Sequence, residues 1–152
     1  MKNFYKKGIS IIEILVIIAV LGVIFSIIVP QFSKSREMQV LKSGVADTLS
    51  SIDKARGETL SSLDSASYGV HFQSDKVIIF KGIVFSASDV NNETINIITP
   101  AIISSIALQG GGSDVYFNRL SGAPSTTGTV TISTTSYSKI ITISATGVVS
   151  VN

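Results

Sequence analysis

A long, predominantly apolar run from Ile9 to Val29 constrains this chain more than any other feature of its sequence. Its 21 residues would form roughly 32 Å of α-helix, and the hydrocarbon core of a bilayer is about 30 Å thick. The run therefore predicts a helix that spans a membrane once. Glu13 lies inside it, and a carboxylate at the bilayer centre costs on the order of 2.5 to 3.5 kcal/mol, so we expect Glu13 to need a cationic partner.

The charges on either side of the run predict its orientation. Lys2, Lys6 and Lys7 precede it, so the positive-inside rule places residues 1–8 in the cytoplasm and the chain after Pro30 on the other side. A secretory signal peptide would be followed by small residues suited to signal cleavage, whereas FSIIVPQFSKS follows here. We therefore favour a retained membrane helix over a conventional signal peptide.

The segment KKGISIIE, Lys6 to Glu13, resembles the processing motif of type IV prepilins and type II secretion pseudopilins. The resemblance implies that prepilin peptidase cleaves between Gly8 and Ile9 and methylates the new amino group of Ile9. Ile9 itself departs from the Phe or Met that is more usual after the cut. Ser10 stands where Thr is common and keeps the hydroxyl group.

Gly22 and Pro30 extend the resemblance, since the family commonly carries a proline that loosens the helix at this distance from the cut. The resemblance also implies that Glu13 pairs with the N-terminal amine of a neighbouring subunit during assembly. Such a pair makes two buried charges tolerable together, and removing one partner would strand the other. The alternative is that Glu13 merely reaches the bilayer surface in an ordinary signal anchor.

A second helical pattern follows Pro30. Apolar residues recur every three or four positions and form an amphipathic stripe, which predicts a helix that continues to about Gly57 or Leu63 and packs on a sheet. The stripe comprises Met38, Leu41, Val45, Leu49 and Ile52.

From Tyr68 onward the sequence predicts short strands separated by turn residues. The nine candidate segments are YGVHF, KVIIF, IVF, TINII, AIISSIAL, DVYF, GTVTIS, KIITIS and GVVSV. This pattern predicts an α+β protein with a long N-terminal helix and a β-rich head, and the resemblance to prepilins implies that the helix packs on the head in the pilin fold. The expected division is a leader over 1–8, a transmembrane and filament-core helix over 9–29, an amphipathic helix half over 30–63 and the head over 64–152.

Alternating residues make the last strands the clearest part of the head. Val130 and Ile132, and likewise Ile141 and Ile143, alternate with Ser and Thr, which predicts one buried and one solvated face. TTSYS and ATG are expected to form the two connecting turns. The ending Ile141 to Val151 also resembles minor pilins and pseudopilins of the H type.

Composition excludes several functional classes. The chain has no cysteine, so it can contain neither disulfides nor thiolate metal sites. Nine Lys/Arg residues face nine Asp/Glu residues after Pro30, and Lys139 is the last basic residue, so we expect no nucleic acid partner.

The sequence offers little for catalysis. His71 is the single histidine, and we predict that it is a structural residue in a strand. The densest group of oxygen ligands is predicted to form a turn and not a calcium site. It comprises Asp89, Asn91, Asn92 and Glu93. We accordingly expect no enzyme, no metal site and no cofactor.

The resemblance predicts a structural subunit, either a minor pilin or a pseudopilin, of a type IV pilus or type II secretion pseudopilus. Its expected partners are prepilin peptidase, other pilin or pseudopilin subunits and the inner-membrane assembly platform. It would sit in the cytoplasmic membrane as a single-pass protein with an extracytoplasmic head, before it enters the filament. The alternative is a signal-anchored extracytoplasmic binding domain that does not polymerise.

Overall fold

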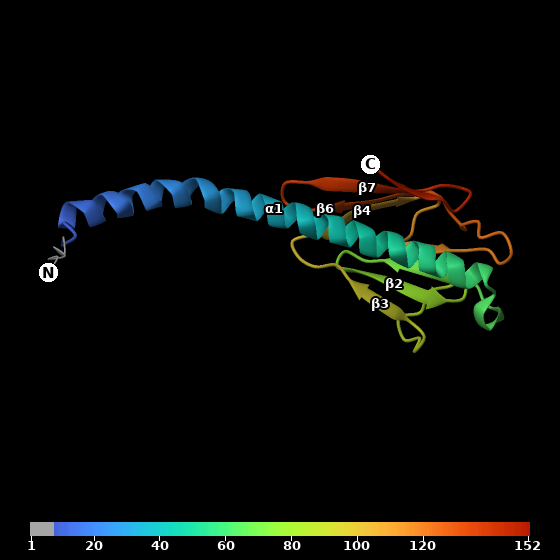
Figure 1. Ribbon diagram of the computed structural model, residues 1–152. Helices are drawn as coiled ribbons and strands as arrows, with labels where there is room; N and C mark the ends of the chain where they lie inside the picture. Colours follow the sequence, from blue (N-terminus) through green and yellow to red (C-terminus); the bar gives the residue numbers. More distant parts are fainter. Residues whose placement is uncertain (1–7) are drawn as a thin grey trace, which may run out of the picture. The chain divides into compact units, whose positions relative to one another are not determined.

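The structure, a computed structural model, describes residues 8–152 (Figure 1). Of the predicted leader only Gly8 falls within this range, so Lys2, Lys6 and Lys7 lie outside the described residues. The chain divides into two compact units, residues 1–36 and 37–152. The single long helix α1 (Ile11–Leu60) contributes residues to both units.

Helix α1 begins where the carbonyl of Ser10 accepts hydrogen bonds from the amides of Glu13 and Ile14, at 3.1 and 3.2 Å. It is assigned as helix through Gly22 and Pro30. It ends near Ser62, whose left-handed backbone (φ 54°) cannot continue a right-handed helix. The end at Leu60 lies between the two predicted positions, and a short 3₁₀ helix, η1 (Leu63–Ser65), follows.

Two four-stranded sheets follow, and all of their strand pairs are antiparallel. The first has the order β3-β2-β1-β5 and the second has the order β4-β6-β7-β8. The long helix with antiparallel sheets confirms the predicted α+β class. The strands are β1 (Tyr68–Phe72), β2 (Lys76–Lys81), β3 (Glu93–Asn96), β4 (Ile102–Leu108), β5 (Asp114–Tyr116), β6 (Gly128–Ser133), β7 (Ser138–Ile143) and β8 (Val149–Val151).

One of the nine strand predictions is wrong. The segment Ile83–Phe85 forms an irregular connection after β2. Gly82, at φ 111°, turns the chain out of β2 in a backbone region that favours glycine. Ile83 and Val84 are exposed as a result, while the ring of Phe85 stacks on His71 at a centroid distance of 3.9 Å.

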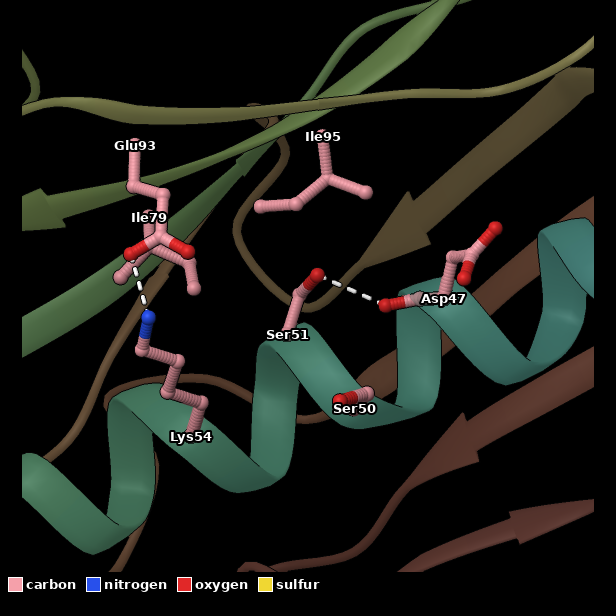
Figure 2. Close-up of a pocket in the computed structure, with 7 residues that line it drawn as sticks. All are labelled: Asp47, Ser50, Ser51, Lys54, Ile79, Glu93 and Ile95. Carbon is pink, nitrogen blue, oxygen red and sulfur yellow. Dashed lines mark hydrogen bonds and ion pairs between the residues drawn. The ribbon is translucent and has the colours of Figure 1, made fainter.

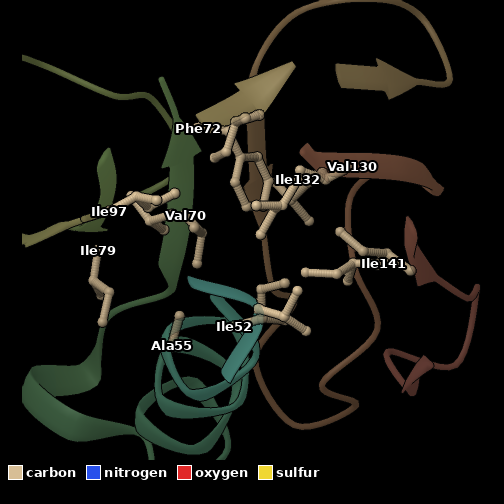
Figure 3. Close-up of a cluster of buried hydrophobic side chains, with 14 of the residues drawn as sticks. Ile52, Ala55, Val70, Phe72, Ile79, Ile97, Val130, Ile132 and Ile141 are labelled. Atoms are coloured by element: carbon tan, nitrogen blue, oxygen red, sulfur yellow. The ribbon is translucent and has the colours of Figure 1, made fainter. Parts of the chain in front are cut away.

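The core of the head lies between the helix and the inner faces of both sheets. In Figure 1, β2 and β3 lie on one side of the head portion of α1, and β4, β6 and β7 lie on the other. Figure 3 shows Ile52 and Ala55 of α1 facing Val70 and Ile79 of one sheet and Ile141 of the other. The alternation predicted for β6 and β7 is confirmed, since their inward residues are buried: Val130, Ile132, Ile141 and Ile143.

The amphipathic stripe is confirmed at its centre. Leu41, Val45 and Ile52 are buried, while Met38 and Leu49 are half-buried. The same face also buries small and polar residues that hydrophobic periodicity does not register: Gly44, Thr48, Ser51, Ala55 and Thr59.

These small residues bring the helix close to the sheets. A Cβ atom placed on Gly44 would lie 3.3 Å from Cγ2 of Ile97, which is tight for a carbon contact. The hydroxyl of Thr59 donates to the carbonyl of Ala55 and accepts from the amide of Tyr68, both at 2.8 Å. This buried hydroxyl therefore joins the end of α1 to the start of β1.

Candidate functional site

The N-terminal segment contains every site residue that the sequence predicted. Gly8 and Ile9 are exposed and precede α1, in backbone that belongs to no helix or strand. Among the described residues, no heavy atom beyond its chain neighbours lies within 4 Å of the Cβ position of Gly8. Within residues 8–152, nothing therefore packs on Gly8.

Glu13 lies in the first turn of α1 and is exposed. The unpaired backbone amides at a helix N-terminus favour a carboxylate there. Within residues 8–152 no basic group lies close enough to form an ion pair with Glu13. Any cation that neutralises this carboxylate must therefore come from outside the described residues or from another molecule.

The apolar side chains around Glu13 are uncovered. The large apolar residues from Ile9 to Phe32 keep between 40% and 84% of their surface exposed. A continuous apolar surface of this extent marks a site that lipid or protein must cover. This part of α1 is long and apolar enough to cross a membrane, and none of its most apolar window is buried within the molecule.

Gly22 and Pro30 both lie inside the helix. In the described part of the chain, no heavy atom beyond the chain neighbours and the local helix backbone lies within 4 Å of the Cβ position of Gly22. Pro30 has no amide hydrogen, so the carbonyl of Ser26 loses its usual helical donor. The hydroxyl of the same residue, Ser26, donates to the carbonyl of Val23, at 2.8 Å. Both residues weaken the local helix energetically, while loosening on assembly remains a prediction.

The head carries a small polar pocket of about 130 Å³ between α1, β2 and β3 (Figure 2). Lys54 forms an ion pair with Glu93 across it, and the Ser51 hydroxyl donates to the carbonyl of Asp47 at 2.7 Å. The hydrogen bond to Glu93 raises the pKa of Lys54 above its ordinary value. Because the Lys54 amine is paired and its pKa is raised, it stays protonated and is not available as a base or nucleophile. The residues that line the pocket are Asp47, Ser50, Ser51, Lys54, Ile79, Glu93 and Ile95.

His71 lies in β1, as predicted for a strand residue. Its Nδ1 pairs with the carboxylate of Asp114 on β5, and its Nε2 lies 3.0 Å from Nε2 of Gln73. Neither ring nitrogen meets a hydroxyl group in the described part of the chain, so the geometry is not that of a serine triad. The contacts instead connect β1, β5 and Phe85.

The oxygen-rich group after β2 forms a turn. Asp89 accepts from the backbone amide of Asn91 at 2.9 Å and from its side-chain amide at 2.8 Å. These bonds lower the pKa of Asp89 below its ordinary value. Asn92 donates to the carbonyl of Ser86, and Glu93 pairs with Lys54. Asp89, Asn91 and Asn92 thus lie in the turn, while Glu93 begins β3 and points to α1. The Oδ1 atom of Asn92 is buried and has no hydrogen-bond partner among the described residues.

The sequence did not predict two polar connections that hold the head together. Arg56 donates through Nε to the carbonyl of Gly122 at 3.1 Å and through Nη2 to that of Thr146 at 3.2 Å. Lys81 pairs with Asp64 at 2.8 Å, which joins β2 to η1. The partners of Arg56 lie 66 and 90 residues away in the sequence, so no local motif predicts these contacts.

Comparison with protein-family models, with curated proteins and with solved structures gives no match to this chain. Functional assignment therefore rests on the N-terminal motif and on the geometry of the segment that carries it.

Proposed function

We propose that this chain is a prepilin-type subunit, either a minor pilin or a pseudopilin, that assembles from the cytoplasmic membrane into a type IV pilus or type II secretion pseudopilus. The observation that supports this most directly is the position of Glu13. It lies in the first turn of an uncovered apolar helix, five residues after an exposed glycine, and no basic group within residues 8–152 pairs with it.

Cleavage between Gly8 and Ile9 would supply the missing cation. It leaves an α-amino group on Ile9, and methylation of that amine retains its positive charge. The amine and the carboxylate of Glu13 both lie at the start of α1. In a bundle of such helices, the amine of one subunit meets the Glu13 carboxylate of its neighbour and fixes their axial register.

The remaining steps follow from the same helix. Before assembly, lipid covers the apolar residues and the lysines of the leader keep it on the cytoplasmic side. After cleavage, the corresponding helices of other subunits replace the lipid. The partners are then prepilin peptidase, the other subunits and the inner-membrane assembly platform. The head has the pilin fold in this proposal.

The neutral variant Glu13→Gln tests the assembly step. The parent contains no cysteine, so a single cysteine at Val16 reports helix packing as disulfide-linked species in the native membrane. Removing one partner of a buried ion pair costs about 3 to 5 kcal/mol, so we expect at least tenfold fewer linked species while cleavage continues. Glu58→Gln, on the head portion of α1, is the matched control and should match the parent.

Equal cross-linking of the Glu13→Gln variant and the parent would contradict the proposal. It would favour the alternative, a signal-anchored extracytoplasmic binding domain in which Glu13 has no assembly role.

A further inference from the structure

Strand β8 has an unpaired edge whose hydrogen-bonding groups are defined by its register with β7. The amides and carbonyls of Ile140 and Asn152 exchange hydrogen bonds at 3.1 and 3.0 Å. Since antiparallel pairs alternate, Ser150 bonds to Thr142, and the amide and carbonyl groups of Val149 and Val151 point away from β7. β8 is the last strand of its sheet, and no other strand of the described chain lies beside it.

An apolar groove of about 190 Å³ runs beside this edge. Helix α1 contributes Val45, Ala46 and Leu49, and β8 contributes Val151. Val45 is buried beneath it, while Leu49 and Val151 are half-buried. A strand added to β8 would therefore find open backbone partners on one side and aliphatic side chains of the helix below it.

The groove is positively charged. Lys42 of α1 and Lys139 of β7 line it and are exposed. Within residues 8–152 neither lysine forms an ion pair. Carboxylates on an incoming segment would therefore meet two available ammonium groups.

The other sheet provides a contrast. Its edge strand β3 also faces α1, but the pocket between them is lined by Asp47, Ser50 and the Lys54–Glu93 ion pair. That pocket is polar and its lysine is already neutralised. An aliphatic, acidic segment thus fits β8 and not β3.

We propose that the edge of β8 binds an extended, acidic segment of another protein, which adds to the sheet as a further strand. Its alternate aliphatic side chains pack on Val45, Ala46 and Leu49, and its carboxylates pair with Lys42 and Lys139. Backbone bonds to Val149 and Val151 supply affinity, and the groove supplies selectivity. The inference uses the head alone and does not depend on processing at Gly8.

Hydrogen exchange on the full chain in detergent micelles tests this inference. The probe is a synthetic peptide, Asp-Val-Thr-Val-Thr-Val-Asp, and its counterpart has lysine in place of both aspartates. Saturating acidic peptide should slow exchange of the Val149 and Val151 amides at least tenfold. The amide of Ser150 is an internal control, because it already bonds to β7 and should change much less.

Two variants separate charge from backbone pairing. The double variant Lys42→Glu, Lys139→Glu should weaken acidic peptide binding at least tenfold and improve binding of the lysine peptide, whereas Lys76→Glu on β2 should change neither. Val151→Pro removes an outward amide that β7 does not use, and should abolish binding. If that variant does not fold, the charge variants still decide the outcome.

Three results of the peptide experiments would each overturn the inference: no binding of the acidic peptide at millimolar concentration, equal binding of both peptides, or binding without protection of Val149 and Val151. Efficient disulfide formation between two copies carrying Val151→Cys would also overturn it, because a second copy would then cover this edge.

Discussion

At the scale of single residues, Thr59 illustrates how one hydroxyl joins two elements. It is fully buried, and it accepts the amide hydrogen of Tyr68, which has no strand partner at that position. Thr48 is equally buried, but it only donates to the carbonyl of Gly44, one turn earlier in the same helix. Two equally buried threonine hydroxyls therefore contribute differently to the stability of the head.

The variant Thr59→Val should destabilise the head by about 1 to 3 kcal/mol, because it preserves shape but leaves the buried amide of Tyr68 unsatisfied. Thr48→Val should change stability by less than about 1 kcal/mol, since the Gly44 carbonyl keeps its helical donor. Urea unfolding of the full chain in micelles, followed by circular dichroism, measures both. Equal losses would contradict the role assigned to Thr59.

The ion pair of Asp64 with Lys81 predicts that the stability of the head depends on pH. The hydrogen bond from Lys81 lowers its pKa below the ordinary value of 3.8. A lowered folded-state pKa contributes stability that is present above pH 3.8 and is lost as the pH falls through the folded value.

The difference in Tm between the parent and Asp64→Asn should therefore be constant from pH 6 to about pH 5 and shrink below 3.8. Asp53→Asn is the control, since Asp53 makes no ion pair within residues 8–152. A difference that grows as the pH falls would contradict the assigned pairing.

At the scale of elements, the head portion of α1 combines two kinds of glycine. Gly44 faces the sheets at close approach. At Gly57, no heavy atom of residues 8–152 beyond the chain neighbours and the local helix backbone lies within 4 Å of the Cβ position. Glycine inside a helix is less favourable than most residues by about 0.5 to 1 kcal/mol. The two positions should therefore respond to the same substitution with opposite signs.

We expect Gly57→Leu to stabilise the head by about 0.5 kcal/mol through helix propensity. Gly44→Leu should destabilise it by about 1 to 3 kcal/mol, because the added atoms overlap Ile97 and overpack the core. Thermal unfolding measures both variants. Stabilisation by Gly44→Leu would show that the helix does not approach the sheet as described.

Local pattern predicts these elements where large apolar residues alternate regularly. Val130, Ile132, Ile141 and Ile143 follow the two-residue period of a strand, and Leu41, Val45 and Ile52 follow the period of a helix. The same reading fails at Ile83–Phe85, which is apolar but follows a glycine that turns the chain away. It also misses Thr59, because hydrophobic periodicity does not register a buried hydroxyl.

Contacts between distant residues could not be predicted in this way. His71 and Asp114 meet because β1 and β5 pair in one particular register, and 43 positions separate them in the sequence. The open edge of β8 likewise follows from strand order. The candidate processing site differs, because Gly8, Ile9 and Glu13 lie within six consecutive residues and a local motif can therefore identify them.

At the scale of the whole molecule, the proposed function requires the head to lie on the extracytoplasmic side of the membrane. Because the parent lacks cysteine, single cysteines report it directly. Ala145→Cys, in the exposed turn between β7 and β8, should react with a membrane-impermeant maleimide in intact spheroplasts. Asn3→Cys in the uncleaved Gly8→Ala background should react only after lysis. The reverse pattern would contradict the proposed topology.

Processing as a prepilin can be read from the intact mass and N-terminal sequence of the protein recovered from its native membrane. We expect a chain that begins with methylated Ile9, and an uncleaved chain for the Gly8→Ala variant. A parent protein that still begins at Met1 would rule out processing and leave Glu13 without the partner that its position requires.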